Sequence, residues 1–193
     1  MRTSEAIEKE VAACLAASDF AQAATLALKG YGPQILLYLR GVVRDDDLSD
    51  DVFADFSERL WRSIRDFRGE ASFGTWAYRI AWCALKDLER TRARRREDRL
   101  ATDEVSRIVQ EVRTATATAI GTQARDGWAK IKDSLTPGER SLLLLRVEKN
   151  LPWKEVAAIM AEEGETAAEA ALRQRLVRLN DKLKLLAKEH GLR

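Results

Sequence analysis

The sequence predicts an all-α fold, and three observations support this prediction. Apolar residues recur at intervals of three and four along most of the chain, as in amphipathic helices. The 193 residues include only three prolines, at positions 33, 137 and 152, so few helices need to be interrupted. No segment shows the sustained β-branched alternation of a strand. We expect two small helical domains, at 1–98 and 128–193, joined by a linker at 99–127.

Composition and charge narrow the class of protein. With 46% hydrophobic residues, a chain of this length can bury a core in each of two small domains. The formal net charge of +2 conceals a strong segregation of charge. Seven acids and one base lie between residues 44 and 58, whereas five bases and no acid lie between residues 90 and 96. Blocks of opposite sign indicate two different kinds of partner.

The cysteines and the N-terminal residues indicate the cellular compartment of the protein. Cys14 and Cys83 are far apart in apolar helical patterns, without CxxC or histidine-rich spacing. We therefore expect them to be core residues in a reducing compartment. The first ten residues, MRTSEAIEKE, are charged, and no apolar run has the length of a signal peptide or a membrane span. We expect a cytoplasmic protein without membrane insertion, cofactor or bound metal.

The first part of the chain divides into several predicted helices. Ser4 can cap the first helix, and Asp19 begins a capping-box spacing for a second segment that closes at Gly30. Pro33 opens a third, strongly apolar helix. The acidic cluster Asp45–Asp47 ends that helix and supplies caps for the next one, which we expect at 48–64.

The helix expected at 48–64 has two distinct faces. Its apolar stripe and the aromatic residues beside it are Val52, Phe53, Phe56, Leu60, Trp61 and Ile64. The other face carries Asp50, Asp51, Asp55, Glu58, Arg59 and Arg62. One interpretation is the solvated face of an ordinary amphipathic helix. The other is a docking face for a basic or helical partner, because it combines an aromatic anchor with charges that steer association.

The segment 67–96 combines aromatic rings with a run of arginines. A short polar loop leads into an aromatic-rich helical pattern, and five of the last seven residues are arginine. Exposed bases stack on aromatic rings for roughly 1–3 kcal/mol each, and arginines neutralise phosphates. The segment therefore fits single-stranded or opened nucleic acid. A buried helix followed by a solvated basic tail is the alternative.

The remainder of the chain predicts a linker and a helix-turn-helix unit. Residues 105–112 form one apolar helical stripe, but the small residues that follow are weakly patterned and indicate a linker that is helical at its start. Thr136 and Pro137 open a further helix, and another is expected from Trp153 to Met160. A long basic helix from about 167 to 190 completes a layout typical of DNA-reading proteins. An ordinary three-helix bundle is the alternative.

Two groups of residues form longer patterns, separated by the expected linker. The first group is Asp51, Val52, Phe53, Leu60, Trp61, Phe67, Arg68, Gly69, Glu70, Trp76, Tyr78, Arg79, Ile80 and Ala81. The second group is Leu135, Glu139, Arg140, Leu145, Arg146, Glu155, Val156, Ala157, Leu172, Arg173, Arg175, Leu176, Arg178 and Leu183. In content and order, the two groups resemble the second and fourth conserved regions of the bacterial extracytoplasmic-function (ECF) sigma factors of RNA polymerase.

The resemblance implies three binding surfaces and no catalytic residue. Docking on the clamp helices of the polymerase's largest subunit would involve Asp51, Phe53, Asp55, Glu58 and Trp61. Capture of an opened −10 element would involve Phe67, Arg68, Glu70, Ser72, Phe73, Trp76, Arg79, Trp82, Cys83, Lys86, Arg90, Arg94 and Arg95. Reading of the −35 element would involve Thr166, Arg173, Gln174, Arg175, Arg178 and Lys182. The implied partners are core RNA polymerase, including its flap, promoter DNA and an anti-sigma factor.

The chain departs from the family pattern at a few positions. Ala54 stands where the family usually has glutamine, and Trp82 and Cys83 replace an arginine-asparagine pair. The loop before the last helix is also longer than usual. These departures leave open a second hypothesis, a helical regulator that binds polymerase or another partner without recognising promoters.

A nucleic-acid enzyme is the third hypothesis. The acids of residues 45–51 could bind a metal ion, but such a cluster before a helix more often serves capping and solvation. The single histidine, His190, lies near the chain end and is a poor candidate for a catalytic base.

Overall fold

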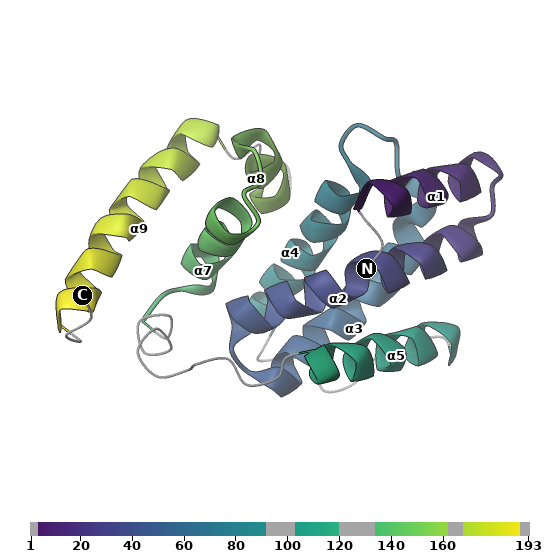
Figure 1. Cartoon of the computed structure of the whole chain (residues 1–193), viewed down its shortest axis with the longest axis horizontal. Coiled ribbons are helices and arrows are strands. Elements are labelled where there is room, and N and C mark those ends of the chain that lie inside the picture. Colours follow the sequence, from purple (N-terminus) through teal and green to yellow (C-terminus); the bar gives the residue numbers. More distant parts are fainter. Residues whose placement is uncertain (1–3, 92–102, 120–133, 162–167, 190–193) are drawn as a thin grey trace.

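The computed structural model describes residues 4–91, 103–119, 134–161 and 168–189. Every regular element within these ranges is helical (Figure 1). The predicted all-α fold is therefore confirmed. None of the described helices combines the length and the apolar character needed to cross a lipid bilayer.

The first two helices form an antiparallel pair, α1 at Ser4–Ala16 and α2 at Phe20–Val43. Asp19 caps α2 as expected, since its carboxylate accepts a hydrogen bond from the Gln22 amide at 3.1 Å. The predicted break between Gly30 and Pro33 is wrong, because α2 runs through both residues.

Tertiary packing explains why α2 continues past its proline. The residues that α2 buries, from Ala23 to Val42, lie both before and after Pro33, so one continuous helix covers the core along this length. Gly30 allows a close approach to α1, since a Cβ atom there would lie 2.7 Å from Cγ2 of Ile7. The proline removes one helical hydrogen bond, and burial of this long apolar face outweighs that cost.

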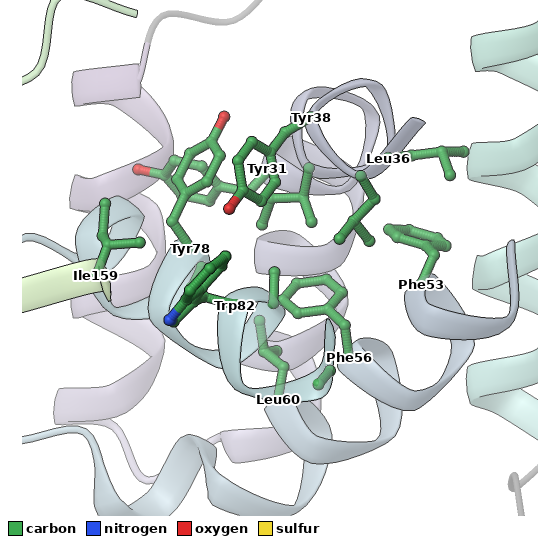
Figure 2. Close-up of a cluster of buried hydrophobic side chains, with 14 of the residues drawn as sticks. Tyr31, Leu36, Tyr38, Phe53, Phe56, Leu60, Tyr78, Trp82 and Ile159 are labelled. Atoms are coloured by element: carbon green, nitrogen blue, oxygen red, sulfur yellow. The ribbon is translucent and has the colours of Figure 1, made fainter. Parts of the chain in front are cut away.

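Three further helices complete the N-terminal unit: α3 at Asp46–Ser63, followed by a 3₁₀ turn at Ile64–Asp66; α4 at Phe73–Thr91; and α5 at Asp103–Ala119. The side chains of Phe53, Phe56 and Leu60 are fully buried between α3 and its neighbours (Figure 2). These side chains and the apolar face of α2 belong to one hydrophobic core.

Helix α5 corrects the predicted domain boundary. Residues 103–119 were expected to belong to a linker at 99–127, but they form a helix that packs against α2 and α3. Its apolar stripe, from Val105 to Val112, is buried. The stripe at helical spacing is enough to dock the helix, and of the small residues that follow it Thr114 and Ala115 are exposed whereas Thr116 is buried.

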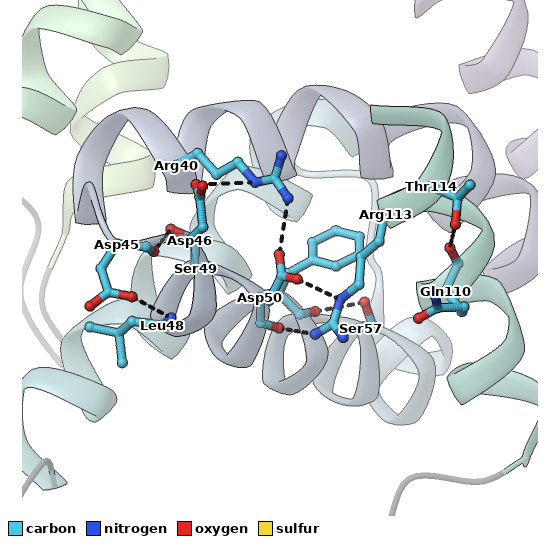
Figure 3. A network of polar contacts seen from close by, with 11 residues as sticks. Arg40, Asp45, Asp46, Leu48, Ser49, Asp50, Ser57, Gln110, Arg113 and Thr114 are labelled. Carbon is cyan, nitrogen blue, oxygen red and sulfur yellow. Dashed lines mark hydrogen bonds and ion pairs between the residues drawn. The ribbon is translucent and has the colours of Figure 1, made fainter. Parts of the chain in front are cut away.

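A polar network joins α2, α3 and α5 (Figure 3). Arg113 donates a 2.5 Å hydrogen bond to the backbone carbonyl of Asp50 and forms a 3.4 Å ion pair with its carboxylate. Arg40 reaches the same carboxylate at 3.4 Å and Asp46 at 3.8 Å. Asp45 caps α3, as predicted, by accepting from the Leu48 amide at 2.9 Å. Several of these clustered acids therefore have structural partners.

The C-terminal unit contains α7 at Pro137–Leu143, a π turn at Leu144–Glu148, α8 at Trp153–Met160 and α9 at Glu169–Glu189. The predicted start of α7 is confirmed in detail. Thr136 and Glu139 form a reciprocal capping box, with the Thr136 amide donating to the Glu139 carboxylate at 2.8 Å. The uninterrupted helix expected after Pro137 instead changes to π geometry at Leu144.

The two units share one core. Helix α7 packs on α2, and α8 packs on α4. Tyr38 of α2 and Ser141 of α7 form a buried hydrogen bond of 2.5 Å. Figure 2 shows Ile159 of α8 in the same apolar cluster as Tyr78 and Trp82 of α4.

Candidate nucleic-acid interface

The loop before α4 presents exposed polar groups next to a hydrogen-bonded helix start. Gly69 has φ of 71°, a left-handed conformation that suits glycine and turns the chain. Arg68, Glu70 and Ser72 are exposed. The Ser72 hydroxyl accepts from the Thr75 amide at 3.0 Å and donates to the Thr75 hydroxyl at 2.8 Å. The loop therefore ends in a fixed helix start, with polar edges facing solvent.

An aromatic cluster supports this loop. The ring centroids of Phe67, Phe73 and Trp76 lie 5.1–5.3 Å apart in tilted or edge-to-face geometry. Phe73 is buried and also packs against Tyr31 at 5.8 Å. It is therefore a structural support in this conformation, which corrects its expected role as a surface that stacks on a base. Phe67 and Trp76 are half-buried and keep accessible edges.

The later turns of α4 carry the other expected −10 residues. Arg79 donates a 2.6 Å hydrogen bond to the carbonyl of Ala158 in α8. Trp82 is only 5% exposed, and the Lys86 ammonium lies 5.7 Å from the centre of its ring. Cys83 is half-buried, and Arg90 is exposed. Arg94 and Arg95 lie outside the described residues.

The expected polymerase-docking residues divide into two groups. Phe53 is fully buried, so it cannot touch a partner in this conformation, and its expected role as a contact residue is corrected to a core role. Asp51, Asp55, Glu58 and Trp61 are partly exposed along α3.

Ion pairs hold part of this α3 face in place. Arg59 binds Asp55 at 2.8 Å and Asp87 of α4 at 2.6 Å. Partial burial opposes the charge of Arg59, but hydrogen bonds to these two carboxylates raise its pKa overall. These ion pairs therefore link the exposed face of α3 to α4.

Helix α9 carries most of the expected −35 residues, of which Arg173 lies 5.6 Å from the centre of the Trp153 ring and Arg175 reaches toward Gly138 of α7. Arg173, Gln174, Arg175 and Arg178 are exposed. Lys182 instead points back to α7, where its ammonium lies 3.1 and 2.9 Å from the two carboxylate oxygens of Glu139. Partial burial opposes ionisation of Glu139, but the hydrogen bonds from Lys182 and the Thr136 backbone lower its pKa overall. Thr166 lies outside the described residues.

Sequence reasoning missed two carboxylates, those of Glu155 and Glu8, that accept hydrogen bonds at the start of α4. The Thr75 hydroxyl donates to the Glu155 carboxylate at 2.7 Å, across 80 positions of sequence. Glu8 accepts from the Gly74 amide at 3.1 Å and from the Tyr31 hydroxyl at 3.0 Å. No local spacing links these partners, so only the fold reveals them.

The described side chains offer no evident metal centre, because no group of three or more His, Cys, Asp or Glu residues among them is placed to hold a metal ion. Their acidic residues lie mainly at helix caps and in ion pairs.

Comparisons with known proteins find similarity to sigma factors. Residues 27–96 match the family model described as Sigma-70 region 2. The chain is 28% identical over 145 residues to the ECF RNA polymerase sigma-E factor of Haemophilus influenzae, covering 72% of this chain and 76% of that protein.

A solved structure shares the fold. It is the sigma factor RpoE in complex with the anti-sigma factor NepR from Bartonella quintana, with a TM-score of 0.60 and 18% identity, and the match covers 88% of this chain and 97% of that chain. Residues 27–96 therefore form a Sigma-70 region 2 segment, and over a longer part of the chain the sequence is similar to an ECF sigma factor.

Proposed function

We propose that this protein is an alternative sigma factor that binds core RNA polymerase and directs promoter-specific initiation through −10 and −35 elements. The observation that carries the proposal is the start of α4. An exposed polar loop, residues 68–72, stands on the Phe67, Phe73 and Trp76 rings and is followed by a helix with basic residues. Rings beside cations suit unstacked bases and their phosphates.

The polymerase-docking surface is the exposed face of α3. Trp61 supplies a half-buried aromatic anchor, and Asp51, Asp55 and Glu58 supply the acidic edge. Buried aromatic anchors dominate many protein interfaces, while charges at the rim mainly steer association. Phe53 supports this surface from inside the core.

The −10 surface uses the loop for bases and α4 for the backbone. Arg68, Glu70 and Ser72 provide donors and acceptors for a base taken out of the stack, and Phe67 and Trp76 provide ring edges beneath it. The −35 surface is the exposed side of α9, with Arg173, Arg175 and Arg178 for the major groove and its phosphates.

The proposed role requires binding surfaces, and we assign no catalytic residue and no cofactor. The bacterial polymerase and its templates are cytoplasmic, so the proposal places the protein in the cytoplasm. An anti-sigma factor is a further proposed partner, supported by the fold shared with a sigma factor that was solved bound to one.

The −10 assignment is tested by Arg68→Ala with Glu70→Ala in the full chain bound to core polymerase. Both side chains are exposed, so the fold should survive their loss. We expect normal polymerase capture and at least a tenfold loss of open complexes, measured by permanganate footprinting. Arg65→Ala is the matched control, because Arg65 is exposed nearby but stacks on Phe20 at 5.2 Å. Equal footprints for all three proteins would contradict the assignment.

The second candidate function is a sigma-like regulator that binds polymerase without recognising promoters. The burial of Trp82 on the expected −10 face favours it. Polymerase capture without any promoter-dependent transcript would support this regulator over the sigma factor.

A further inference from the structure

Helix α1 contributes a carboxylate to the start of the helix that carries the proposed −10 surface. The Oε1 atom of Glu8 accepts a hydrogen bond from the Gly74 amide at 3.1 Å. Helix α4 begins at Phe73, so this amide is among the first four, which have no carbonyl partner within the helix. A carboxylate at this end also interacts favourably with the helix dipole. Glu8 therefore caps α4 from 66 positions away in the sequence.

A second hydrogen bond fixes the position of this carboxylate. The Tyr31 hydroxyl donates to the same Oε1 atom of Glu8 at 3.0 Å, and the Ser4 hydroxyl lies 3.2 Å from the Tyr31 oxygen. The Tyr31 ring is 2% exposed and packs against Phe73 with 5.8 Å between the ring centroids. Gly74 permits this close approach, because a Cβ atom there would lie 3.1 Å from Cε1 of Tyr31. The half-buried Glu8 side chain is therefore held by two donors on one oxygen.

The exposed loop at 68–72 continues directly into this capped turn. Ser72 is its last residue, and the Ser72 hydroxyl accepts from the Thr75 amide at 3.0 Å. Two neighbouring amides at the start of α4 thus have different partners. Ser72 satisfies the Thr75 amide locally, whereas Glu8 satisfies the Gly74 amide across the fold. The contact with Glu8 therefore ties the end of the loop to α1.

Helix α1, at Ser4–Ala16, lies before residues 27–96, which match the Sigma-70 region 2 model. The expected −10 residues run from Phe67 to Arg95, so all of them lie inside the matched segment. The group that fixes the start of α4 therefore comes from outside the segment that carries the expected DNA contacts.

We propose that Glu8 is a positioning residue for the −10 surface, because its hydrogen bond to the Gly74 amide holds the loop at 68–72 in the orientation that receives an unstacked base. This inference rests on the proposed function. Glu8 acts through α4 and does not itself contact DNA. A binding loop whose supporting contacts are lost must be ordered when the ligand binds, and this ordering lowers the affinity.

Hydrogen exchange resolved to the Gly74 amide measures the contact without DNA. Glu8→Ala removes the acceptor, and Glu8→Asp keeps the charge but shortens the side chain by one methylene group. Both variants should accelerate exchange of this amide about threefold to tenfold, the effect of losing one hydrogen bond. Glu8→Gln keeps an acceptor oxygen at the same reach and should exchange at nearly the parent rate. Amides of α9 serve as the internal reference.

Permanganate footprinting of the same full-length variants bound to core polymerase measures the consequence for DNA, on a genomic fragment that the parent holoenzyme transcribes. Glu8→Ala and Glu8→Asp should lower the fraction of open complexes about threefold to tenfold at unchanged polymerase capture, in parallel with the exchange rates. Glu8→Gln should stay close to the parent. Glu5→Ala is the matched control, because it removes the same charge from α1 and its ion pair with Lys9, at 3.1 Å, lies at the surface.

The central comparison is between Glu8→Asp and Glu8→Gln, because both keep a polar side chain and circular dichroism checks that both are folded. Unchanged exchange at Gly74 in Glu8→Ala would overturn the positioning role, and so would full promoter opening by Glu8→Asp. A loss of opening in Glu8→Gln but not in Glu8→Asp would also overturn it, since charge would then matter more than the hydrogen bond. No promoter opening by the parent protein would instead overturn the proposed function, and the positioning role with it, whereas the contact of Glu8 with α4 would still stand on the exchange rates.

Discussion

The buried hydrogen bond between Tyr38 and Ser141 predicts an energetic coupling between the two helical units. Their hydroxyl oxygens are 2.5 Å apart, and both side chains are almost fully buried. The residues belong to α2 and α7, 103 positions apart. Substitution at either position therefore tests whether the shared core exists in solution.

The expected magnitudes differ for the two single variants. Ser141→Ala leaves the Tyr38 hydroxyl buried without its partner, which should lower the free energy of unfolding by about 1–3 kcal/mol. Tyr38→Phe should cost less, about 1 kcal/mol, because a helical serine can donate to the carbonyl four residues earlier. The double variant removes both groups, so its loss should be about 1 kcal/mol smaller than the sum of the single losses.

Urea unfolding followed by far-ultraviolet circular dichroism measures this cycle in the full chain. A control cycle pairs Ser141→Ala with Thr25→Ala, because the Thr25 hydroxyl donates only within its own helix, to Ala21 at 2.9 Å. The control losses should add to within about 0.5 kcal/mol. Additive losses in the Tyr38 cycle would refute the docking of α7 on α2.

Three other predictions address docking, DNA reading and ionisation. Trp61→Ala should weaken capture by core polymerase at least about thirtyfold in a binding titration, as loss of an interface anchor does, whereas Leu37→Ala, at a 44% exposed residue of α2, should not. Equal affinities would reject α3 as the docking surface. Arg178→Ala should lower the slope of log binding constant against log salt concentration by about one, the value for one lost phosphate contact. Lys188→Ala, near the end of the same helix, should leave this slope unchanged. Burial raises the pKa of all three tyrosines, that of Tyr31 to about 12, so their contribution to stability is complete below pH 10 and is lost as the pH rises through the folded-state values. Absorbance at 295 nm should therefore rise together with loss of helical signal, and phenolate formation near pH 10 in folded protein would contradict the burial.

Local signals in the sequence predicted the elements whose ends depend on nearby residues. Asp45 and Thr136 were predicted as caps and act as caps, because a capping residue and its target are three positions apart. Helix α9 was also expected close to its observed range, since its apolar spacing and the polar loop before it are both local.

Features decided by tertiary contact could not be predicted in the same way. Local rules placed a break at Pro33, but α1 and α5 both pack on α2, and burial before and after the proline favours one continuous helix. The weak pattern after residue 112 suggested a linker, but the helix that begins with the buried stripe from Val105 to Val112 continues to Ala119. The contact of Thr75 with Glu155 joins residues 80 positions apart, so no spacing could reveal it.

The candidate site shows the same division. Arg68 and Glu70 are exposed in the loop before α4, and Arg173 and Arg178 are exposed on α9, so these residues stay candidates for DNA contact. Phe53 and Phe73 are core residues, because the aromatic spacing that marks a binding face also marks a buried one. Whether an aromatic residue of a helix is buried or faces a partner depends on which other helices pack against it, and local spacing does not contain this information.

In vitro transcription tests the central claim most directly. Purified full chain and core polymerase would be incubated with bacterial genomic DNA fragments, and the 5′ ends of the RNA would be mapped. We predict a set of start sites, absent with core polymerase alone, that share two upstream sequence elements at constant spacing. Stable binding to core polymerase with no start sites beyond those of the core alone would contradict the claim.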